Sequence, residues 1–286
     1  MIQSMTGFGK ASLQLPTKKI TVEIKSLNSK GLDLNTRMPS VFREMELGLR
    51  NQISQRLERG KVDFSLYVEV TGEETTSKIN VPIVKGYINQ MKAVIPTADE
   101  TELMKMVVRM PDALKTERDE IDENEWKQIQ TVIDEALENI ANFRKDEGAS
   151  LEKEFQLRIS NINNLMNEAV SYDAERVETV KTRLRTALDE LKVNVDENRF
   201  EQELIFYLEK YDITEEKVRL GNHLSYFLET LNGTEANGRK LGFITQEMGR
   251  EINTMGSKSN HTEMQKLVVM MKDELEKIKE QVLNVL

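Results

Sequence analysis

The chain has 286 residues, of which 38% are hydrophobic and 31% are charged, a balance that suits long, solvated helices around one large core or two modest ones. It contains no cysteine, which excludes disulfide bonds and cysteine-ligated zinc. The first residues lack the basic and apolar regions of a signal peptide, and no apolar run reaches transmembrane length. We therefore expect a cytoplasmic protein without a membrane partner.

The net charge of −9 argues against a protein that coats nucleic acid through electrostatics alone. The charge is uneven, however. Residues 1–70 contain 11 Lys and Arg against 7 Asp and Glu, a balance of +4 that leaves −13 for the remainder. A basic N-terminal region beside an acidic body leaves room for a local anionic partner, although ordinary variation in surface charge explains it equally well.

The N-terminal region, residues 1–80, alternates between apolar and polar side chains in two long runs, residues 19–27 and 61–70. The apolar positions are Ile20, Val22 and Ile24 in the first run and Val62, Phe64, Leu66, Val68 and Val70 in the second. Strict alternation predicts half-buried antiparallel strands. Between them, apolar residues at helical spacing over 42–57 predict a helix that stops before Gly60.

The rest of the chain is predicted to be mostly helical, which makes the fold class α+β. Residues 81–145 form a helical connection, residues 146–195 a long helical arm with almost no helix breakers, and residues 196–286 a C-terminal helical region. Over 264–285, apolar residues recur in steps of four and three, the heptad pattern of a helix packed along a partner. That partner belongs either to the same chain or to another subunit, and the pattern alone does not choose.

Familiar phosphate-binding and zinc-protease motifs are absent from the sequence. Catalysis by a pair of histidines would need both His223 and His261, which lie on different predicted helices. His261 stands at a helix start, where capping or surface exposure is the simpler explanation. The charged helices of the C-terminal region are the other candidates for a catalytic site.

The run DITEEKVRLGNH opens one of these helices. Asp212 can cap it, and Glu215 completes a capping-box pattern. Glu216, Arg219 and His223 then follow one stripe of the helix, where a carboxylate, a guanidinium and an imidazole can hold a metal-bound water or a phosphate. A surface salt bridge between Glu216 and Arg219 is the simpler alternative.

A second charged helix is predicted over residues 239–255. Glu247 and Glu251 are one turn apart, so both carboxylates can approach one point. Paired oxygen ligands suit Mg²⁺ or Mn²⁺, which activate water and neutralise phosphate. The cations that could bind phosphate oxygens are Arg239, Lys240, Arg250 and Lys258. A surface helix with i, i+4 charge pairs is the simpler explanation of the spacing alone.

The segment GRKLGFITQEMGREINTMGSKS, residues 238–259, closely resembles the C-terminal signature of the YicC/YloC family, and DITEEKVRLGNH resembles its companion motif. The start SMTGF, the run VEIKSLNSKGLDLNTRMP at 22–39 and LERGKVDF at 57–64 resemble the family's N-terminal region. The closing KIKEQVLNV also fits. The resemblance covers the whole chain and is weakest over residues 75–200.

The chain departs from the family pattern at three places. The family often has Asp at the position of Gly242, Asn at the position of Gly249, and a His-Arg-aromatic run where this chain has Ser29-Lys30-Gly31. If those family residues bind metal or RNA, this chain uses neighbours instead. Because glycine lowers helix propensity, we expect something to pack closely against Gly242 and Gly249.

The resemblance implies a cytoplasmic endoribonuclease that needs a divalent cation and assembles as a hexameric ring around RNA. We assign metal binding to Glu247, Glu251 and Glu216, and catalysis to Glu247 and Glu251 with His223 as a ligand or general base. The cations assigned to RNA phosphates are Arg219, Arg239, Lys240, Arg250 and Lys258. The resemblance marks the motifs, and these individual roles are our own assignment.

Two other classes of function stay open at this point. A non-catalytic, oligomeric RNA-binding adaptor would keep the cations and would have no need of the paired carboxylates. A purely structural helical scaffold would need neither, and it predicts no salt-dependent RNA binding.

Overall fold

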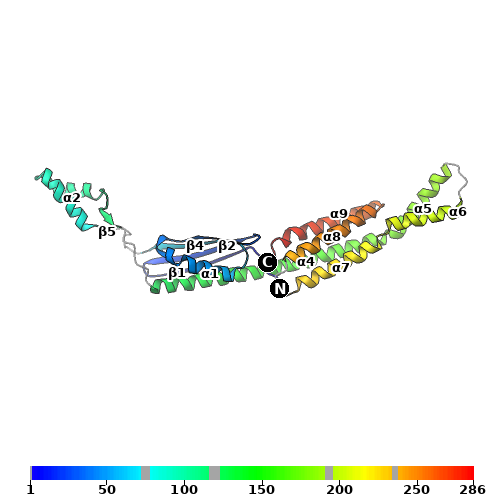
Figure 1. Cartoon of the computed structure of the whole chain (residues 1–286), viewed down its shortest axis with the longest axis horizontal. Coiled ribbons are helices and arrows are strands. Elements are labelled where there is room, and N and C mark those ends of the chain that lie inside the picture. Colours follow the sequence, from blue (N-terminus) through cyan, green and yellow to red (C-terminus); the bar gives the residue numbers. More distant parts are fainter. Residues whose placement is uncertain (1, 72–77, 116–122, 191–195, 234–237) are drawn as a thin grey trace.

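The computed structural model describes residues 2–71, 78–115, 123–190, 196–233 and 238–286, and the chain forms an elongated molecule (Figure 1). The strands are β1 (Gly7–Gln14), β2 (Lys18–Leu27), β3 (Leu32–Arg37), β4 (Gly60–Val70), β5 (Lys78–Ile79) and β6 (Leu114–Lys115). The helices are the short 3-10 helix η1 (Ser40–Met45), α1 (Glu46–Arg56), α2 (Val81–Val94), α3 (Glu100–Val107), α4 (Glu123–Ser171), α5 (Asp173–Glu190), α6 (Glu197–Tyr211), α7 (Thr214–Leu231), α8 (Gly238–Lys258) and α9 (Thr262–Val282). The predicted α+β class is confirmed.

The N-terminal sheet has the strand order β1-β2-β4-β3. β1, β2 and β4 are antiparallel, as predicted, whereas β3 joins β4 in parallel. The parallel pair is possible because η1 and α1 form the long connection that two parallel neighbours need. Ile20, Val22 and Ile24 are completely buried on the face that α1 and α4 cover. The opposite face is mostly polar, with Phe8 and Tyr67 as exposed aromatic residues, so the observed alternation follows from one-sided burial.

Helix α4 is 49 residues long and connects two hydrophobic cores. Its first half, with Ile129 and Ile140, packs on the sheet. Its second half, with Phe155 and Ile162, packs on the C-terminal helices α7, α8 and α9. The helix runs without a break through residues 145 and 146, where the sequence places the start of the arm (Figure 1).

The heptad seam of α9 finds its partners within the chain. Helices α4 and α8 pack against α9, and every seam residue is at most 4% exposed. The seam residues are Met264, Val268, Met271, Leu275, Ile278, Val282 and Val285. The partner of the seam therefore belongs to the same chain, and the buried seam is not available to another subunit.

Helices α5 and α6 extend beyond the C-terminal core and form the arm (Figure 1). Among their described side chains, Phe200 is the only buried apolar one. The arm therefore has no hydrophobic core of its own. Residues 146–171, predicted as part of the arm, belong to α4 within the C-terminal core.

Residues 78–115 form a small unit at the other end of the molecule (Figure 1). Helices α2 and α3 pack on each other around Val84, Val107 and Ala113, and β5 pairs with β6. The sequence predicted only helix here, because two-residue strands are too short to show an alternating pattern. None of the helices in the described ranges combines the length and the apolar character needed to cross a membrane.

The two ends of the chain meet at the middle of the molecule (Figure 1). The Met5 amide donates to the Asn284 carbonyl over 2.7 Å, and the Leu286 amide donates to the Gln3 carbonyl over 3.0 Å. Residues 2–6 thus lie between α4 and the C-terminus. These bonds connect the N-terminal region directly to the C-terminal helices.

A buried arginine fixes the same region from the side of α4. Arg144 is 2% exposed, and its Nη2 donates to the Met5 carbonyl (3.1 Å), Ser26 Oγ (2.5 Å) and the Arg59 carbonyl (3.1 Å). Loss of hydration on burial lowers the pKa of Arg144 below its usual value. At Gly60, φ is +126°, and a Cβ would lie 2.6 Å from Ser26 Oγ, so the turn beside the guanidinium requires glycine.

Candidate functional site

The two signature runs form neighbouring antiparallel helices, α7 and α8. Near one end of the pair, Lys258 Nζ of α8 lies 2.8 Å from Glu216 Oε1 of α7. Near the other end, Lys240 Nζ lies 4.8 Å from the ring centre of Tyr226. Both helices bury one apolar face in the C-terminal core, which leaves their polar faces to form a common surface.

The carboxylate of Glu216 is engaged by Lys258 and not by Arg219. Glu216 is only 4% exposed, and Lys258 Nζ donates both to its Oε1 and to the Asp212 carbonyl at 2.8 Å. Among the described residues, Glu216 Oε2 is buried without a hydrogen-bond partner. Arg219 pairs with Glu215 on the exposed side of α7, so the simpler alternative of a Glu216–Arg219 salt bridge is wrong.

Asp212 stabilises the start of α7 in a different way from the predicted capping box. Its Oδ1 accepts from the Thr214 amide over 3.1 Å and from the Thr214 hydroxyl over 2.7 Å. The cap position itself is Ile213, which provides no side-chain cap, and Glu215 does not close a box. The bonds from Thr214, followed by the smaller attraction of Lys258, lower the pKa of Asp212 below its usual value.

Because the folded pKa of Asp212 is depressed, its contribution to stability is present above the ordinary value of 3.8 and is lost as pH falls through the lower folded value. We expect Asp212→Asn to unfold at lower urea concentration than the natural protein at pH 7. The difference should shrink when unfolding is repeated at a pH below the depressed folded pKa, where Asp212 has taken up its proton. Asparagine keeps an oxygen that can accept from Thr214, so the variant loses mainly the charge. An equal loss of stability at both pH values would contradict this role of the charge.

The predicted catalytic residues lie along the same stretch of the helix pair. His223 stands between Glu216 and Tyr226 on α7, and Glu247 and Glu251 stand between Lys240 and Lys258 on α8. The three residues thus belong to the part of the helix pair between these two contacts, and whether their side chains act together stays a prediction.

Their individual environments differ. The Glu247 side chain is 42% exposed and pairs with Arg250 over 2.7 Å, whereas Glu251 is 9% exposed and His223 is partly buried. Within the ranges that the structure describes, no group of three or more His, Asp and Glu side chains is close enough to hold a metal ion. Glu216, Glu247 and Glu251 thus do not form a closed set of three ligands.

Four of the five cations assigned to RNA are exposed, and Lys258 alone is largely covered. Arg219 and Arg250 pair with glutamates one turn away. Such exposed pairs contribute little to stability, so a phosphate can compete for the guanidinium. Arg239 and Lys240 lie at the start of α8 beside each other. The exposed cations are therefore available to an anionic chain that follows α8.

His261 caps α9 and is separate from His223. Its Nδ1 accepts from the Met264 amide over 3.5 Å, and its ring stacks on Tyr172 with a centre-to-centre distance of 5.3 Å. Its Nε2 lies 3.8 Å from Glu175 Oε1. The predicted capping role is confirmed.

The sequence did not single out Arg176, which is 3% exposed at the base of the arm. Its guanidinium donates to the carbonyls of Tyr211 and Lys258 and pairs with Asp173 over 2.5 Å. It therefore joins α5 to the ends of α6 and α8. In a helix rich in charge, nothing in the spacing distinguishes such an arginine from a solvated one.

The glycines that depart from the family pattern are not tightly packed. A Cβ at Gly242 would lie 3.8 Å from Val282 Cγ1, and one at Gly249 would lie 3.4 Å from Leu275 Cδ2. Both are ordinary contacts, so the predicted close packing is wrong at Gly242 and marginal at Gly249. Neither position excludes a side chain for steric reasons.

The N-terminal sheet and the C-terminal helices, which α4 joins, are matched by two separate family models. A family model described as endoribonuclease YicC-like, N-terminal region, matches residues 2–153, and one described as endoribonuclease YicC-like, C-terminal, matches residues 169–286. The chain belongs to the YicC family.

Two curated relatives agree with this assignment. The chain is similar to the probable endoribonuclease YicC of Clostridioides difficile strain 630, with 33% identity over 293 residues and all of both chains covered. It is also similar to the probable endoribonuclease YicC of Haemophilus influenzae strain Rd, with 29% identity over 287 residues and 99% of each chain covered.

Proposed function

We propose that the protein is an endoribonuclease that hydrolyses phosphodiester bonds within RNA, uses a divalent cation and works as an oligomeric ring in the cytoplasm. The observation that carries the proposal is the α7–α8 surface, where signature carboxylates, an imidazole and exposed cations share one helix pair. The names of relatives that align over the whole chain support it.

Hydrolysis of a phosphodiester needs a base near the attacking water and positive charge near the phosphate. In the proposal, Glu247, Glu251 or His223 takes the proton, because carboxylates and imidazoles are the side chains that most often act as general bases. Arg239 and Lys240 bind the RNA backbone, where the guanidinium can contact two phosphate oxygens at once.

A divalent cation would supply water activation and neutralise charge on the phosphate. Glu247 and Glu251 are the residues that would hold it, and their oxygens are the ligands that Mg²⁺ and Mn²⁺ prefer. The residues described do not provide a third ligand beside them, and Glu216 is engaged by Lys258. The pair fits only the open form in which one or two carboxylates bind Mg²⁺ together with phosphates and water, so we assign the metal no individual step.

The non-catalytic RNA-binding adaptor is a second candidate, and one observation favours it: the lack of a third metal ligand among the described residues. An adaptor explains why no group of three metal-binding side chains gathers in the described ranges. It gives no reason for Glu247 and Glu251 to stand on the helix that carries Arg239 and Lys240.

Metal removal distinguishes the two candidates. Purified protein is incubated with an end-labelled structured RNA in Mn²⁺, in Mg²⁺ and in EDTA, and the fragments are separated at single-nucleotide resolution. We expect internal cuts with metal and none with EDTA. Binding without any cut would support the adaptor, and cuts that persist in EDTA would contradict the metal requirement.

The ring has its own support and its own test. A basic interior within an acidic exterior would reconcile the +4 of residues 1–70 with the overall charge of −9. The heptad seam offers no support, since it is buried within the chain. Sedimentation of the purified protein measures the number of chains, and a monomer at micromolar concentration would contradict the ring.

A further inference from the structure

Phe243 is an exposed aromatic residue on the signature helix α8. It is 61% exposed, whereas the residues that anchor α8 in the C-terminal core, such as Leu241 and Ile244, are at most 5% exposed. Within α8, all of which the structure describes, Phe243 is the one large apolar residue that is left in water. Packing of the helix therefore gives no reason for a phenylalanine at this position.

The neighbours of Phe243 on the helix surface are residues of the candidate site. Arg239 and Lys240 stand four and three residues before it, and Glu247 stands four residues after it. Residues at these spacings have Cβ atoms about 5–6 Å apart on the surface of a helix. The ring thus stands between two cations on one side and a carboxylate assigned to the reaction on the other.

A contact across the helix pair restricts the cation beside the ring. Lys240 Nζ lies 4.8 Å from the ring centre of Tyr226 on α7, which is 44% exposed. An ammonium group at this distance is attracted to the face of an aromatic ring. Tyr226 therefore holds the charge of Lys240 next to Phe243.

The charge of α8 selects an anionic partner for this surface. Helix α8 contains four Lys and Arg and two Glu, a net +2, whereas α7 and α9 each have a net charge of −1 and the whole chain has −9. The centre of a protein–protein interface is depleted of charged residues, so these surroundings disfavour a protein partner. An aromatic ring flanked by cations is instead the combination with which proteins bind single-stranded nucleic acid.

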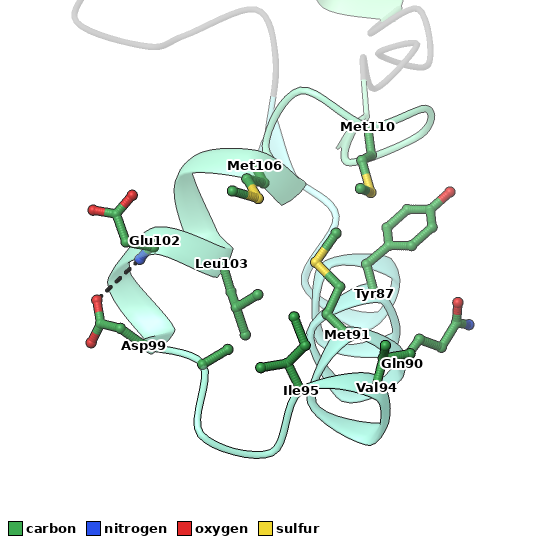
Figure 2. Close-up of a pocket in the computed structure, with 11 residues that line it drawn as sticks. Tyr87, Gln90, Met91, Val94, Ile95, Asp99, Glu102, Leu103, Met106 and Met110 are labelled. Atoms are coloured by element: carbon green, nitrogen blue, oxygen red, sulfur yellow. Dashed lines mark hydrogen bonds between the residues drawn. The ribbon is translucent and has the colours of Figure 1, made fainter.

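Other exposed apolar groups of the chain stand in acidic surroundings. The pocket between α2 and α3 has a volume of about 600 Å³, and the charged residues that line it are Asp99 and Glu102 (Figure 2). Phe206 is 63% exposed on α6, which contains two Lys and Arg and four Glu. Negative charge at both places repels phosphate. Exposure alone therefore does not distinguish Phe243, but its cationic neighbours do.

We propose that Phe243 stacks on one unpaired base of the RNA, while Arg239 and Lys240 bind the adjoining phosphates. The faces of a base within a duplex are covered by its neighbours, so only an unstacked nucleotide can reach the ring. Because Glu247 is one turn from Phe243, cleavage is directed to a phosphodiester beside an unpaired nucleotide. The inference rests on the endoribonuclease of the proposed function and names the structure that its substrate has at the cut.

The stack is tested by binding in EDTA, so that no RNA is cut. Fluorescence anisotropy measures the affinity for a labelled single-stranded RNA of mixed sequence and for the perfect RNA duplex of that sequence. We expect Phe243→Ala to weaken binding of the single strand by about 5- to 100-fold, the loss that corresponds to one stacked base. Affinity for the duplex should stay the same. The salt dependence of single-strand binding should also stay the same, because no cation is removed.

The matched control is Phe206→Ala, which removes an equally exposed phenylalanine from the acidic helix α6. It should bind the single strand as the natural protein does, and far-ultraviolet circular dichroism shows that both variants keep their helices. An unchanged affinity of Phe243→Ala, or an equal loss in both variants, would overturn the stack. A change in the sedimentation of Phe243→Ala alone would make the residue a contact between chains and would also overturn it.

A conservative variant reports on the stack directly. The natural chain has one tryptophan, Trp126, whose ring packs on Phe42 in the N-terminal region at a centre-to-centre distance of 5.8 Å. Phe243→Trp should keep the affinity for the single strand, and the added indole should lose fluorescence when a base stacks on it. The natural protein should show no such loss. Saturating single-stranded RNA that leaves the emission of Phe243→Trp unchanged would contradict stacking at this position.

Failure of the stack and failure of the proposed function give different results. The same single-stranded RNA is incubated with the natural protein in Mn²⁺, and its fragments are separated. Binding that depends on Phe243 without any cut would remove the endoribonuclease and keep the stack. Cutting by a Phe243→Ala protein of natural affinity would keep the endoribonuclease and remove the stack. A natural protein that binds no RNA would overturn both.

Discussion

Replacing Glu247 and Glu251 together with glutamine should lower the rate of RNA cleavage by about 10²–10⁴-fold, the range expected when a general base is lost. Glutamine keeps the shape of the side chain, which matters because Glu251 is only 9% exposed. It removes the negative charge with which the side chain would bind a metal ion or accept a proton. RNA affinity should change little, because the exposed cations stay in place. Single-turnover cleavage and fluorescence anisotropy measure the two quantities.

The matched control is Glu263→Gln/Glu276→Gln on α9. These glutamates pair with lysines three residues later, as Glu247 pairs with Arg250, and the same number of negative charges is removed. The control should cleave at the natural rate. A Glu247→Gln/Glu251→Gln protein that cleaves as fast as the control would remove the carboxylate pair from the mechanism.

The architecture near the sheet could be predicted because burial on one face imposes a period of two. Ile20, Val22 and Ile24 follow that rule and are completely buried. The parallel pairing of β3 was not predictable in this way, because an alternating strand has the same pattern in either direction. The pairing depends on the η1–α1 connection, whose path the pattern does not specify.

The length of α4 shows a second limit of periodicity. An apolar stripe indicates that a helix face is buried, but it does not identify the partner. Ile140 packs on the sheet and Phe155 packs on α7, yet both follow from the same spacing within one helix. The boundary that the sequence predicts near residue 145 therefore does not coincide with any break in α4.

The sequence identified the two helices that carry the candidate site, but it did not identify the contacts between their side chains. Spacing brought Glu216 and Arg219 together on one stripe, whereas the structure pairs Glu216 with Lys258, 42 residues later in the chain. A tertiary partner in a covered position is favoured over an exposed neighbour, because the buried carboxylate would otherwise lose its hydration without compensation. The roles of Arg144 and Arg176 could not be predicted for the same reason, since their acceptors are carbonyls from distant segments.

The second large effect concerns the place where the two ends of the chain meet. A Cβ at Gly148 of α4 would lie 2.2 Å from the Ile2 carbonyl oxygen and 3.0 Å from Gln3 Cα. Both are backbone atoms, so residues 2–6 would have to move away from α4. We expect Gly148→Ala to lower the free energy of unfolding by about 2–3 kcal/mol, as overpacking does in other cores. Urea unfolding followed by circular dichroism measures it.

Gly221→Ala on α7 is the matched control for Gly148→Ala, because both glycines are inside helices and a Cβ at Gly221 meets no atom within 4 Å. That change should raise the free energy of unfolding by about 0.5–1 kcal/mol through helix propensity alone. Opposite signs for the same chemical change would show that contact with residues 2–6 decides the effect. Equal stabilisation by both would mean that this segment does not pack on α4. Hydrogen exchange at the Met5 amide, which donates to Asn284, locates the loss in the segment itself.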